Sequence, residues 1–280
     1  MQPEKENLPR GFGEPDHVTQ NEHTKPAGQN QQSGIPAAGA AVASQIQQEV
    51  QVARLPWYYV LRQARFLLII YIIGLALIGA LAFWVHVHPV LGVDVAITRE
   101  FQESHTPWLE TFMVAVSFLG NTDWVFIPLI VLTAVAFWAL RLRLEAVTIL
   151  VVNLTSAILN VGIKLLVDRP RPSAPLVEIF QHATGNSFPS GHVMSYVAYW
   201  SLLFTFSIML FRGWRWWKIV ILVISGLFIV LVGPSRIYLG DHWASDVLGA
   251  YLIGGLWVWF CLWVYTRLKA RGVLAYTRSK

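Results

Sequence analysis

Six long apolar runs constrain this chain more than any other feature of its sequence. They cover residues 66–85, 124–140, 146–163, 193–211, 219–235 and 247–266. Each run is close to the roughly 20 residues that a helix needs to cross the hydrocarbon core of a bilayer. Because lipid offers the backbone no hydrogen-bonding partner, continuous runs of this length fold there as helices. We therefore expect an all-α, polytopic membrane protein with six transmembrane helices.

The composition agrees with a membrane protein. Of the 280 residues, 55% are hydrophobic and 13% are charged, about half the charged fraction of a typical soluble protein. Segment 93–119 mixes apolar residues with Arg99, Glu100, Glu103 and His105. We expect it to be an extracytoplasmic interfacial or re-entrant helical segment rather than a seventh span.

The two ends of the chain differ from the apolar middle. Residues 1–56 are rich in Gln, Asn, Gly and Pro and poor in aromatic residues, a composition that cannot bury enough surface to fold. We expect a disordered cytoplasmic tail there, a six-helix membrane domain over 57–267, and a basic cytoplasmic tail over 268–280. The single cysteine, Cys261, excludes an internal disulfide.

Basic residues predict the orientation in the membrane. They gather before the first run, between the second and third, between the fourth and fifth, and after the sixth. With six spans, all four groups fall on one side, which the positive-inside bias identifies as the cytoplasm. Both termini are then cytoplasmic in an integral cell-membrane protein, and segments 164–191 and 233–243 face the outside.

Three polar groups interrupt the apolar sequence on that outer side. They are Lys164 with Asp168-Arg169-Pro170-Arg171-Pro172, then Pro189-Ser190-Gly191-His192, and then Ser235-Arg236 with His242 and Asp246. Their basic side chains either snorkel to the interface, as is common near helix ends, or surround an anion. We favour an anion site, because arginine matches the oxygens of a phosphate well. Prolines stiffen the loop that carries Arg169, for which we expect a supporting or headgroup contact.

The two histidines have the chemistry to react with such an anion. His242 and Asp246 are four residues apart, which places them on one helix face. The carboxylate can then hold the Nδ1 proton and leave Nε2 free as a nucleophile. The alternative is an ordinary helix-start carboxylate beside a surface histidine. Pro189-Ser190-Gly191-His192 begins a helix whose free amides suit a phosphate, although the same tetrapeptide is common at helix starts.

Taken together, Lys164-x6-Arg171-Pro172, Pro189-Ser190-Gly191-His192 and Ser235-Arg236-x5-His242-x3-Asp246 resemble the motifs of the type-2 phosphatidic acid phosphatase superfamily. This superfamily includes membrane lipid phosphate phosphatases and is related to vanadium haloperoxidases. The motifs span residues 164–246, and the helix pattern extends the resemblance to about 66–267. Residues 1–56 have no counterpart in the shared core.

The resemblance implies a role for each motif residue. His242 is the nucleophile that forms a phosphohistidine, Asp246 orients it, and His192 protonates the leaving oxygen and then activates water. The groups that hold the phosphoryl oxygens are Lys164, Arg171, Ser190, Gly191 and Arg236. No cofactor or metal is expected. The implied substrate is a lipid phosphate: phosphatidic acid, diacylglycerol pyrophosphate, phosphatidylglycerol phosphate or undecaprenyl pyrophosphate.

Three alternatives stay open at this point. A zinc site on His192, His242, Asp241 and Asp246 is disfavoured because nearby cations repel a divalent ion. A transporter is disfavoured because the charged residues lie at span ends rather than near the bilayer midplane. A lipid phosphotransferase would use the same residues as a phosphatase. Apart from its lipid substrate and the surrounding membrane lipids we expect no obligatory protein partner and no nucleic acid.

Overall fold

The computed structural model describes residues 57–274 apart from 105, 122, 182, 212 and 214. The expected tail over 1–56, the end of the expected C-terminal tail (275–280) and His105 therefore lie outside the described residues. The chain divides into two compact units, Met1–Leu61 and Arg62–Lys280.

Throughout the described ranges, the regular structure is helical, with eight helices joined by short turns and one long loop. They are α2 (Trp57–Val87), α3 (Gly92–Gln102), α4 (Pro107–Asn121), α5 (Asp123–Ala139), α6 (Arg143–Val167), α7 (Gly191–Leu210), α8 (Trp216–Tyr238) and α9 (Ala244–Ala270). The all-α prediction is confirmed for this part of the chain.

Every expected span coincides with a helix. Five helices are long and apolar enough to cross a membrane: α2 from Arg65, α6, α7, α8 and α9. The remaining expected span, 124–140, corresponds to α5, whose apolar part Trp124–Ala139 is shorter. The expected C-terminal tail over 268–280 starts inside α9, which continues to Ala270.

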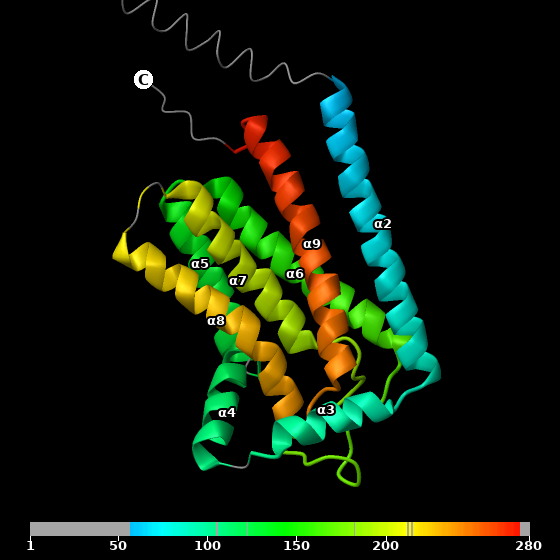
Figure 1. The fold of residues 1–280 in the computed structure, drawn as a ribbon. Coiled ribbons are helices and arrows are strands. Elements are labelled where there is room, and N and C mark those ends of the chain that lie inside the picture. The colour runs from blue at the N-terminus through cyan, green and yellow to red at the C-terminus, as the bar shows by residue number, and fades with distance from the viewer. Residues whose placement is uncertain are drawn as a thin grey trace, which may run out of the picture. The chain divides into compact units, whose positions relative to one another are not determined.

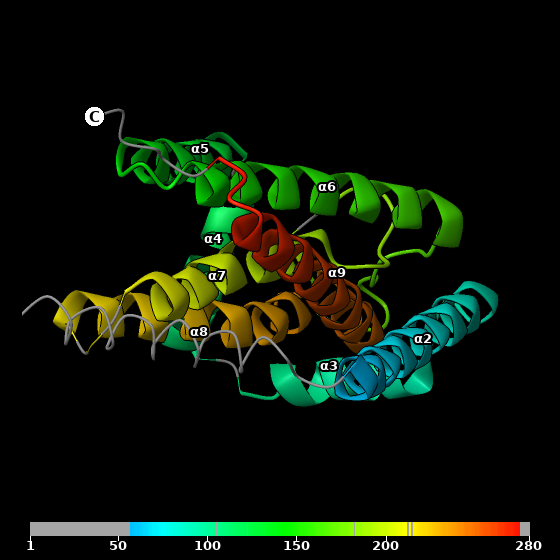
Figure 2. The same cartoon turned by 90° about the horizontal axis from the view of Figure 1, so that it is seen from above.

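The segment 93–119 folds as two helices rather than one. Helix α3 runs across the ends of α8 and α9, whereas the long helices run alongside one another (Figures 1 and 2). Helix α4 packs against α5, α7 and α8. Neither α3 nor α4 is among the five helices of spanning length. Both helices instead contact the elements that carry the polar motifs.

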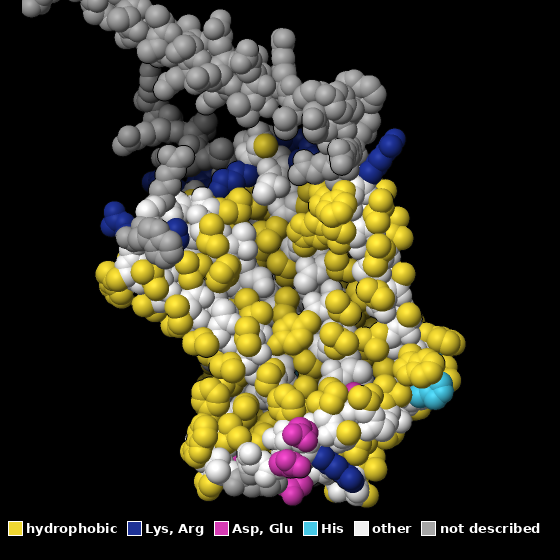
Figure 3. Space-filling model, in the orientation of Figure 1, with side chains coloured by type: hydrophobic (Ala, Val, Ile, Leu, Met, Phe, Trp, Pro, Cys, Tyr) yellow, Lys and Arg dark blue, Asp and Glu magenta, His cyan; other side chains and the backbone are white. Residues whose placement is uncertain are grey.

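Helix α7 provides the centre of the core. It packs against α6, α8 and α9, and its side chains Tyr196, Leu202 and Phe206 are fully buried. The outward faces of the long helices are covered by exposed apolar side chains, which form the broad hydrophobic surface in Figure 3. An apolar exterior of this kind suits contact with lipid.

A close contact between α9 and the loop before α7 fixes the start of α7. A methyl group added at Gly249 would lie 2.4 Å from the ring of Phe188, which is fully buried. The same addition at Gly255, on the exposed face of α9, would meet nothing within 4 Å. Glycine at 249 therefore allows the two segments to approach, and glycine at 255 does not serve this purpose.

These two glycines predict opposite effects of alanine. Gly249→Ala should destabilise the protein by about 1–3 kcal/mol, because a fully packed ring must shift. Gly255→Ala should be neutral or stabilising by up to about 1 kcal/mol, since alanine favours the helix and meets no neighbour. Thermal unfolding of both variants in detergent measures the difference. Equal melting temperatures for the two variants would contradict this account of the packing.

Candidate active site

The three polar groups of the sequence meet at one end of the helices. Lys164 lies in the last turn of α6, and Arg171 lies in the loop that follows. Ser190 caps α7, and Gly191 and His192 form its first turn. Arg236 lies in the last turn of α8, His242 lies between α8 and α9, and Asp246 lies in the first turn of α9. The structure thus brings together all eight site residues predicted from the sequence.

His242 lies between a carboxylate and a guanidinium. Its Nδ1 is 3.6 Å from Asp246 Oδ2 and 3.4 Å from Ser187 Oγ. Its Nε2 is 3.3 Å from Arg171 Nη1. A guanidinium can only donate a hydrogen bond, so Nε2 is the acceptor and the proton of the neutral ring is on Nδ1. This tautomer leaves an unprotonated nitrogen on the side of the cations.

The surroundings of His242 also keep its ring neutral. Burial, followed by the positive charges of Arg171, Lys164 and Arg236, lowers the pKa of His242 well below its usual value. Both effects act against the imidazolium form, because burial disfavours any charge and the cations disfavour a further positive one. Its Nε2 is therefore available as a nucleophile at neutral pH.

Asp246 contacts the start of α9 and also faces His242. Its Oδ2 accepts hydrogen bonds from Ser187 Oγ and from the backbone N–H of Trp243, the latter at 2.9 Å, and also faces His242. The bond to Trp243 forms a cap at the start of α9. Asp246 is therefore a helix-start carboxylate that also faces a histidine, but this histidine is buried and does not lie at the surface.

Two of the predicted anion-binding cations rest on backbone carbonyls. Arg171 donates from Nη1 to the carbonyl of Asp241 at 2.8 Å and from Nε to that of Gly185 at 3.1 Å. Lys164 donates to the carbonyl of Asn186. These contacts tie the cations to the loop before α7 and to the segment that carries His242. They orient the positive charges without neutralising them.

Arg236 is completely buried and is held mainly by residues that the sequence motifs do not include. Its Nη1 donates to Ser117 Oγ of α4 at 2.5 Å and to Gln181 Oε1 at 3.4 Å. It also forms an ion pair with Asp241. Asp241 was considered from the sequence only as a zinc ligand, but here it is an acidic neighbour of Arg236 and lies 3.8 Å from Arg171.

Two groups from the Pro-Ser-Gly-His motif have hydrogen-bonding capacity available for a ligand. Within the described residues, Ser190 Oγ and His192 Nε2 are buried side-chain atoms that make no hydrogen bond. His192 is close enough to Arg236, His242 and Arg171 to interact with them electrostatically. Gly120 at the end of α4 packs on its ring, since a methyl group there would lie 2.5 Å from His192 Cδ2.

Of the two contacts expected for Arg169, the structure shows the supporting contact and not the headgroup contact. Its side chain is fully buried and forms ion pairs with Asp246 and with Asp94 of α3. The sequence offered no signal for Asp94, which lies in the first turn of a short helix of mixed polarity. Ser187 likewise had no role assigned, although it lies only two residues before Pro189, the first residue of the predicted motif. These three residues form a polar layer behind the histidine.

An apolar groove lies between α2, α6 and α9. Its volume is about 370 Å³, and it is lined by Tyr71, Leu75 and Ile78 of α2, Leu159 and Ile163 of α6, and Ile253, Leu256, Trp257 and Phe260 of α9. Ile163 directly precedes Lys164 along α6. The groove and the cationic pocket therefore share one helix.

The chain is similar to known membrane phosphatases. Residues 145–270 match the PAP2 superfamily. Phosphatidylglycerophosphatase B of Bacillus subtilis is 33% identical over 62% of this chain and 84% of its own length. Lipid A 4'-phosphatase of Bacteroides thetaiotaomicron is 30% identical over 64% of this chain and 80% of its own length.

A solved structure shares the fold. The crystal structure of a transmembrane PAP2-type phosphatidylglycerolphosphate phosphatase from Bacillus subtilis superposes with a TM-score of 0.63 at 28% identity, covering 71% of this chain and 96% of that one. The matched residues 145–270 include Lys164, Asp246 and all the motif residues between them. With the motifs assembled at one site and relatives matched over most of their length, the chain belongs to the PAP2 superfamily and is a phosphatase.

Proposed function

We propose that this phosphatase hydrolyses a phosphate or pyrophosphate group of a membrane lipid through a phosphohistidine on His242. The observation that carries the proposal is the orientation of His242, with Nδ1 toward Asp246 and Nε2 toward Arg171. Phosphoryl transfer depends mainly on in-line positioning and on stabilising the charge of the equatorial oxygens. A neutral imidazole beside three cations meets both needs.

The proposed reaction has two steps at the same phosphorus. In the first, His242 Nε2 forms a bond to phosphorus while the bond to the lipid oxygen breaks, and protonated His192 gives that oxygen its proton. In the second, His192 removes a proton from water as the water oxygen attacks the phosphohistidine. The N–P bond then breaks and phosphate leaves. Lys164, Arg171, Arg236, Ser190 and the Gly191 amide stabilise the equatorial oxygens in both steps.

The apolar groove supports a lipid substrate. Ile163 lines the groove between α2, α6 and α9 and directly precedes Lys164 along α6. A lipid whose phosphate is held at Lys164 would therefore have an apolar surface for its hydrocarbon chain on the same helix. The two relatives described above are named for a phosphatidylglycerol phosphate and for lipid A. The candidate substrates are therefore those expected from the sequence: phosphatidic acid, diacylglycerol pyrophosphate, phosphatidylglycerol phosphate and undecaprenyl pyrophosphate.

The proposed reaction needs no metal ion. Lys164, Arg171 and Arg236 already place positive charge where the phosphoryl oxygens would lie, and they would repel a divalent cation. Among the described residues, no three His, Cys, Asp or Glu side chains form a set that could hold a metal. The cations provide the charge stabilisation that a metal provides in other phosphatases.

The proposed orientation has six spans, with α5 as the shortest, and the pocket on the extracytoplasmic face. The basic residues Arg141, Arg143, Lys218, Arg267 and Lys269 lie in turns and helix ends remote in sequence from the motifs. Figure 3 shows Lys and Arg side chains mostly at the end where α9 finishes, and acidic side chains at the other end. The positive-inside bias assigns the first end to the cytoplasm.

Phosphate release tests both the substrate class and the metal-free proposal. The purified protein in detergent should release phosphate from at least one of the four lipid classes in the presence of excess EDTA. Adding an alcohol acceptor separates hydrolysis from phosphotransfer, because a transferase forms a new phosphate ester in place of free phosphate. Loss of activity in EDTA with specific recovery on adding zinc would contradict the metal-free reaction.

Histidine variants test the two proposed steps. His242→Ala should abolish turnover and the acid-labile phosphoenzyme, because no other described group takes its place beside Arg171. His192→Ala should slow phosphoenzyme formation and hydrolysis by about 100- to 10,000-fold, the usual contribution of a general acid–base. His88→Ala, at an exposed histidine outside the pocket, is the control. Substantial activity in His242→Ala would show that the nucleophile is misassigned.

The charges around His242 predict a pH dependence. Attack requires neutral His242, whose pKa lies well below 6.5, so the acid limb of kcat/KM should appear as the pH falls through that lowered pKa. Arg171→Gln removes a neighbouring positive charge, so it should raise the pKa of His242 and move the acid limb to higher pH. Arg267→Gln, at the far end of α9, should leave the limb in place. Profiles on one substrate measure the shift, and an unchanged limb in Arg171→Gln would contradict the assignment.

A further inference from the structure

We infer that Arg169 and Asp94 are positioning residues that hold the Asp246 carboxylate in the orientation needed by His242. The inference rests on the role proposed for Asp246 above. It assigns a positioning role to Arg169, which would not contact the phosphate. It also assigns a supporting role to helix α3, which lies across the ends of α8 and α9. A continuous chain of hydrogen bonds runs from Asp94 of α3 through Arg169, Asp246 and Ser187 to His242.

Arg169 uses its whole guanidinium on protein groups. Its Nη1 donates to Asp246 Oδ1 at 2.5 Å and to Ser245 Oγ at 2.7 Å, and its Nη2 donates to Asp94 Oδ2 at 2.7 Å. Its Nε donates to the carbonyl of Pro89 at 2.9 Å. Because the side chain is fully buried and each of its three nitrogens donates to a protein group, it is not available to bind a substrate phosphate.

Asp94 fixes the first turn of α9 from the opposite side. Its Oδ1 accepts the backbone N–H of Ser245 at 2.9 Å, and its Oδ2 accepts the Ser245 hydroxyl at 2.6 Å as well as the Arg169 guanidinium. A carboxylate at the N-terminus of a helix is stabilised by the free amides there. Asp94 therefore holds both Arg169 and the backbone directly before Asp246.

The two oxygens of the Asp246 carboxylate have different partners. Oδ1 is occupied by Arg169, whereas Oδ2 faces Ser187, the Trp243 amide and His242. A carboxylate bound at one oxygen by an arginine cannot rotate freely, so the second oxygen stays directed at Nδ1. Arg169 also places a positive charge between two buried carboxylates, which offsets part of the cost of removing them from water.

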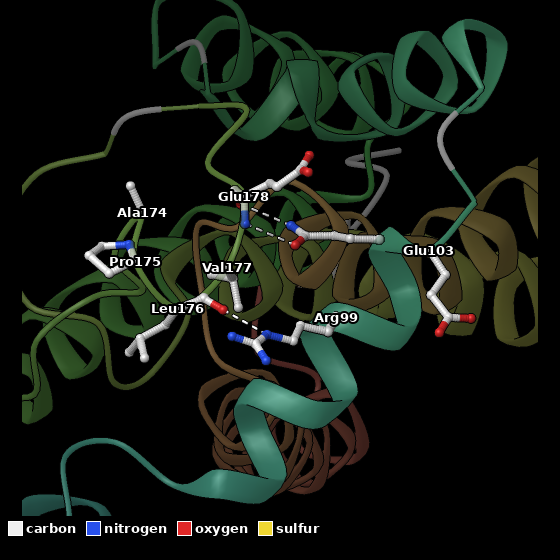
Figure 4. Close-up of a pocket in the computed structure, with 8 residues that line it drawn as sticks. Arg99, Glu103, Ala174, Pro175, Leu176, Val177 and Glu178 are labelled. Atoms are coloured by element: carbon white, nitrogen blue, oxygen red, sulfur yellow. Dashed lines mark hydrogen bonds between the residues drawn. The ribbon is translucent and has the colours of Figure 1, made fainter.

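Helix α3 is itself anchored to the loop that follows Arg171. Arg99 donates to the carbonyl of Leu176 at 2.9 Å, as Figure 4 shows. Gln102 donates to the carbonyls of Glu178 and Tyr238, each at 2.9 Å, and accepts the backbone N–H of Glu178 at 3.1 Å. Asp94 near the start of α3 thus acts from a helix whose other end is braced against the loop and α8.

The experiment compares Arg169→Gln and Asp94→Asn with Asp246→Asn and with the double variant Arg169→Gln/Asp246→Asn. Arg99→Gln is the matched control, since Arg99 also joins α3 to the loop but is exposed and does not contact Asp246. Phosphate release gives kcat and KM, rapid quenching gives the rate of phosphoenzyme formation, and vanadate inhibition reports on the phosphate pocket. Size-exclusion profiles and melting temperatures show which variants fold.

We expect Arg169→Gln to lower kcat and the rate of phosphoenzyme formation by about 10- to 100-fold, as is typical for groups that orient a reactive ligand. KM and vanadate inhibition should change by no more than about threefold, because Arg169 contributes nothing to phosphate binding. Asp94→Asn should lower kcat in the same direction but less, and it tests the inference if Arg169→Gln does not fold. Arg99→Gln should keep the wild-type kcat.

The double variant distinguishes positioning from a general structural effect. If Arg169 acts through Asp246, then Arg169→Gln should slow the Asp246→Asn enzyme by less than about threefold, since coupled residues are not additive. Full multiplication of the two effects, or wild-type kcat in Arg169→Gln or in a folded Asp94→Asn, overturns the inference while leaving the proposed function intact. Wild-type kcat in Asp246→Asn itself would overturn the proposed role of Asp246.

Discussion

The pocket depends on the pairing of charges that have been removed from water. Arg169, Arg236 and Asp246 are each fully buried, and Asp94 and Asp241 are nearly so. An ion in such surroundings is costly unless an opposite charge or several hydrogen bonds replace its hydration. Each of these side chains therefore needs partners from other segments, and this need draws α3, α4, α8, α9 and the long loop to one place.

The same constraint separates the cations into two kinds. Arg169 is saturated by carboxylates and protein acceptors, so it acts as part of the framework. Arg171 and Lys164 instead rest on backbone carbonyls, which orient a positive charge but do not cancel it. Charges held in place before the substrate arrives need little reorganisation when negative charge develops on phosphoryl oxygens. The pocket thus combines a neutral imidazole with positive charge that is already oriented.

The arrangement of the helices explains how the short helices α3 and α4 support the pocket. The long helices run side by side, so that alternate ends meet at one face and collect the motif residues there (Figure 1). Helices α3 and α4 fall short of the spanning length but pack onto these ends, supplying Asp94 and Ser117 to the arginines. Segment 93–119, which was not expected from its sequence to cross the membrane, therefore supplies much of the support around the site.

The sequence by itself determined the helical architecture and the motif residues that the structure brings together in one pocket. Bilayer-length apolar runs are a local property of the chain, and four-residue spacing places His242 and Asp246 on one helix face wherever that helix lies. The motif residues could therefore be identified before their positions were known. Their unusual polarity in an apolar sequence was the signal.

Only the tertiary structure decided which groups support that pocket. Arg169 meets Asp94 across 75 residues of sequence, and Arg236 meets Ser117 across 119. Such contacts depend on how helices cross and on which loop conformation brings two charges within a few ångströms, and no local spacing encodes either. The buried location of Arg169 was for the same reason invisible in the sequence, where one arginine beside a proline resembles another. Local pattern specified the reactive groups, and long-range packing specified their orientation.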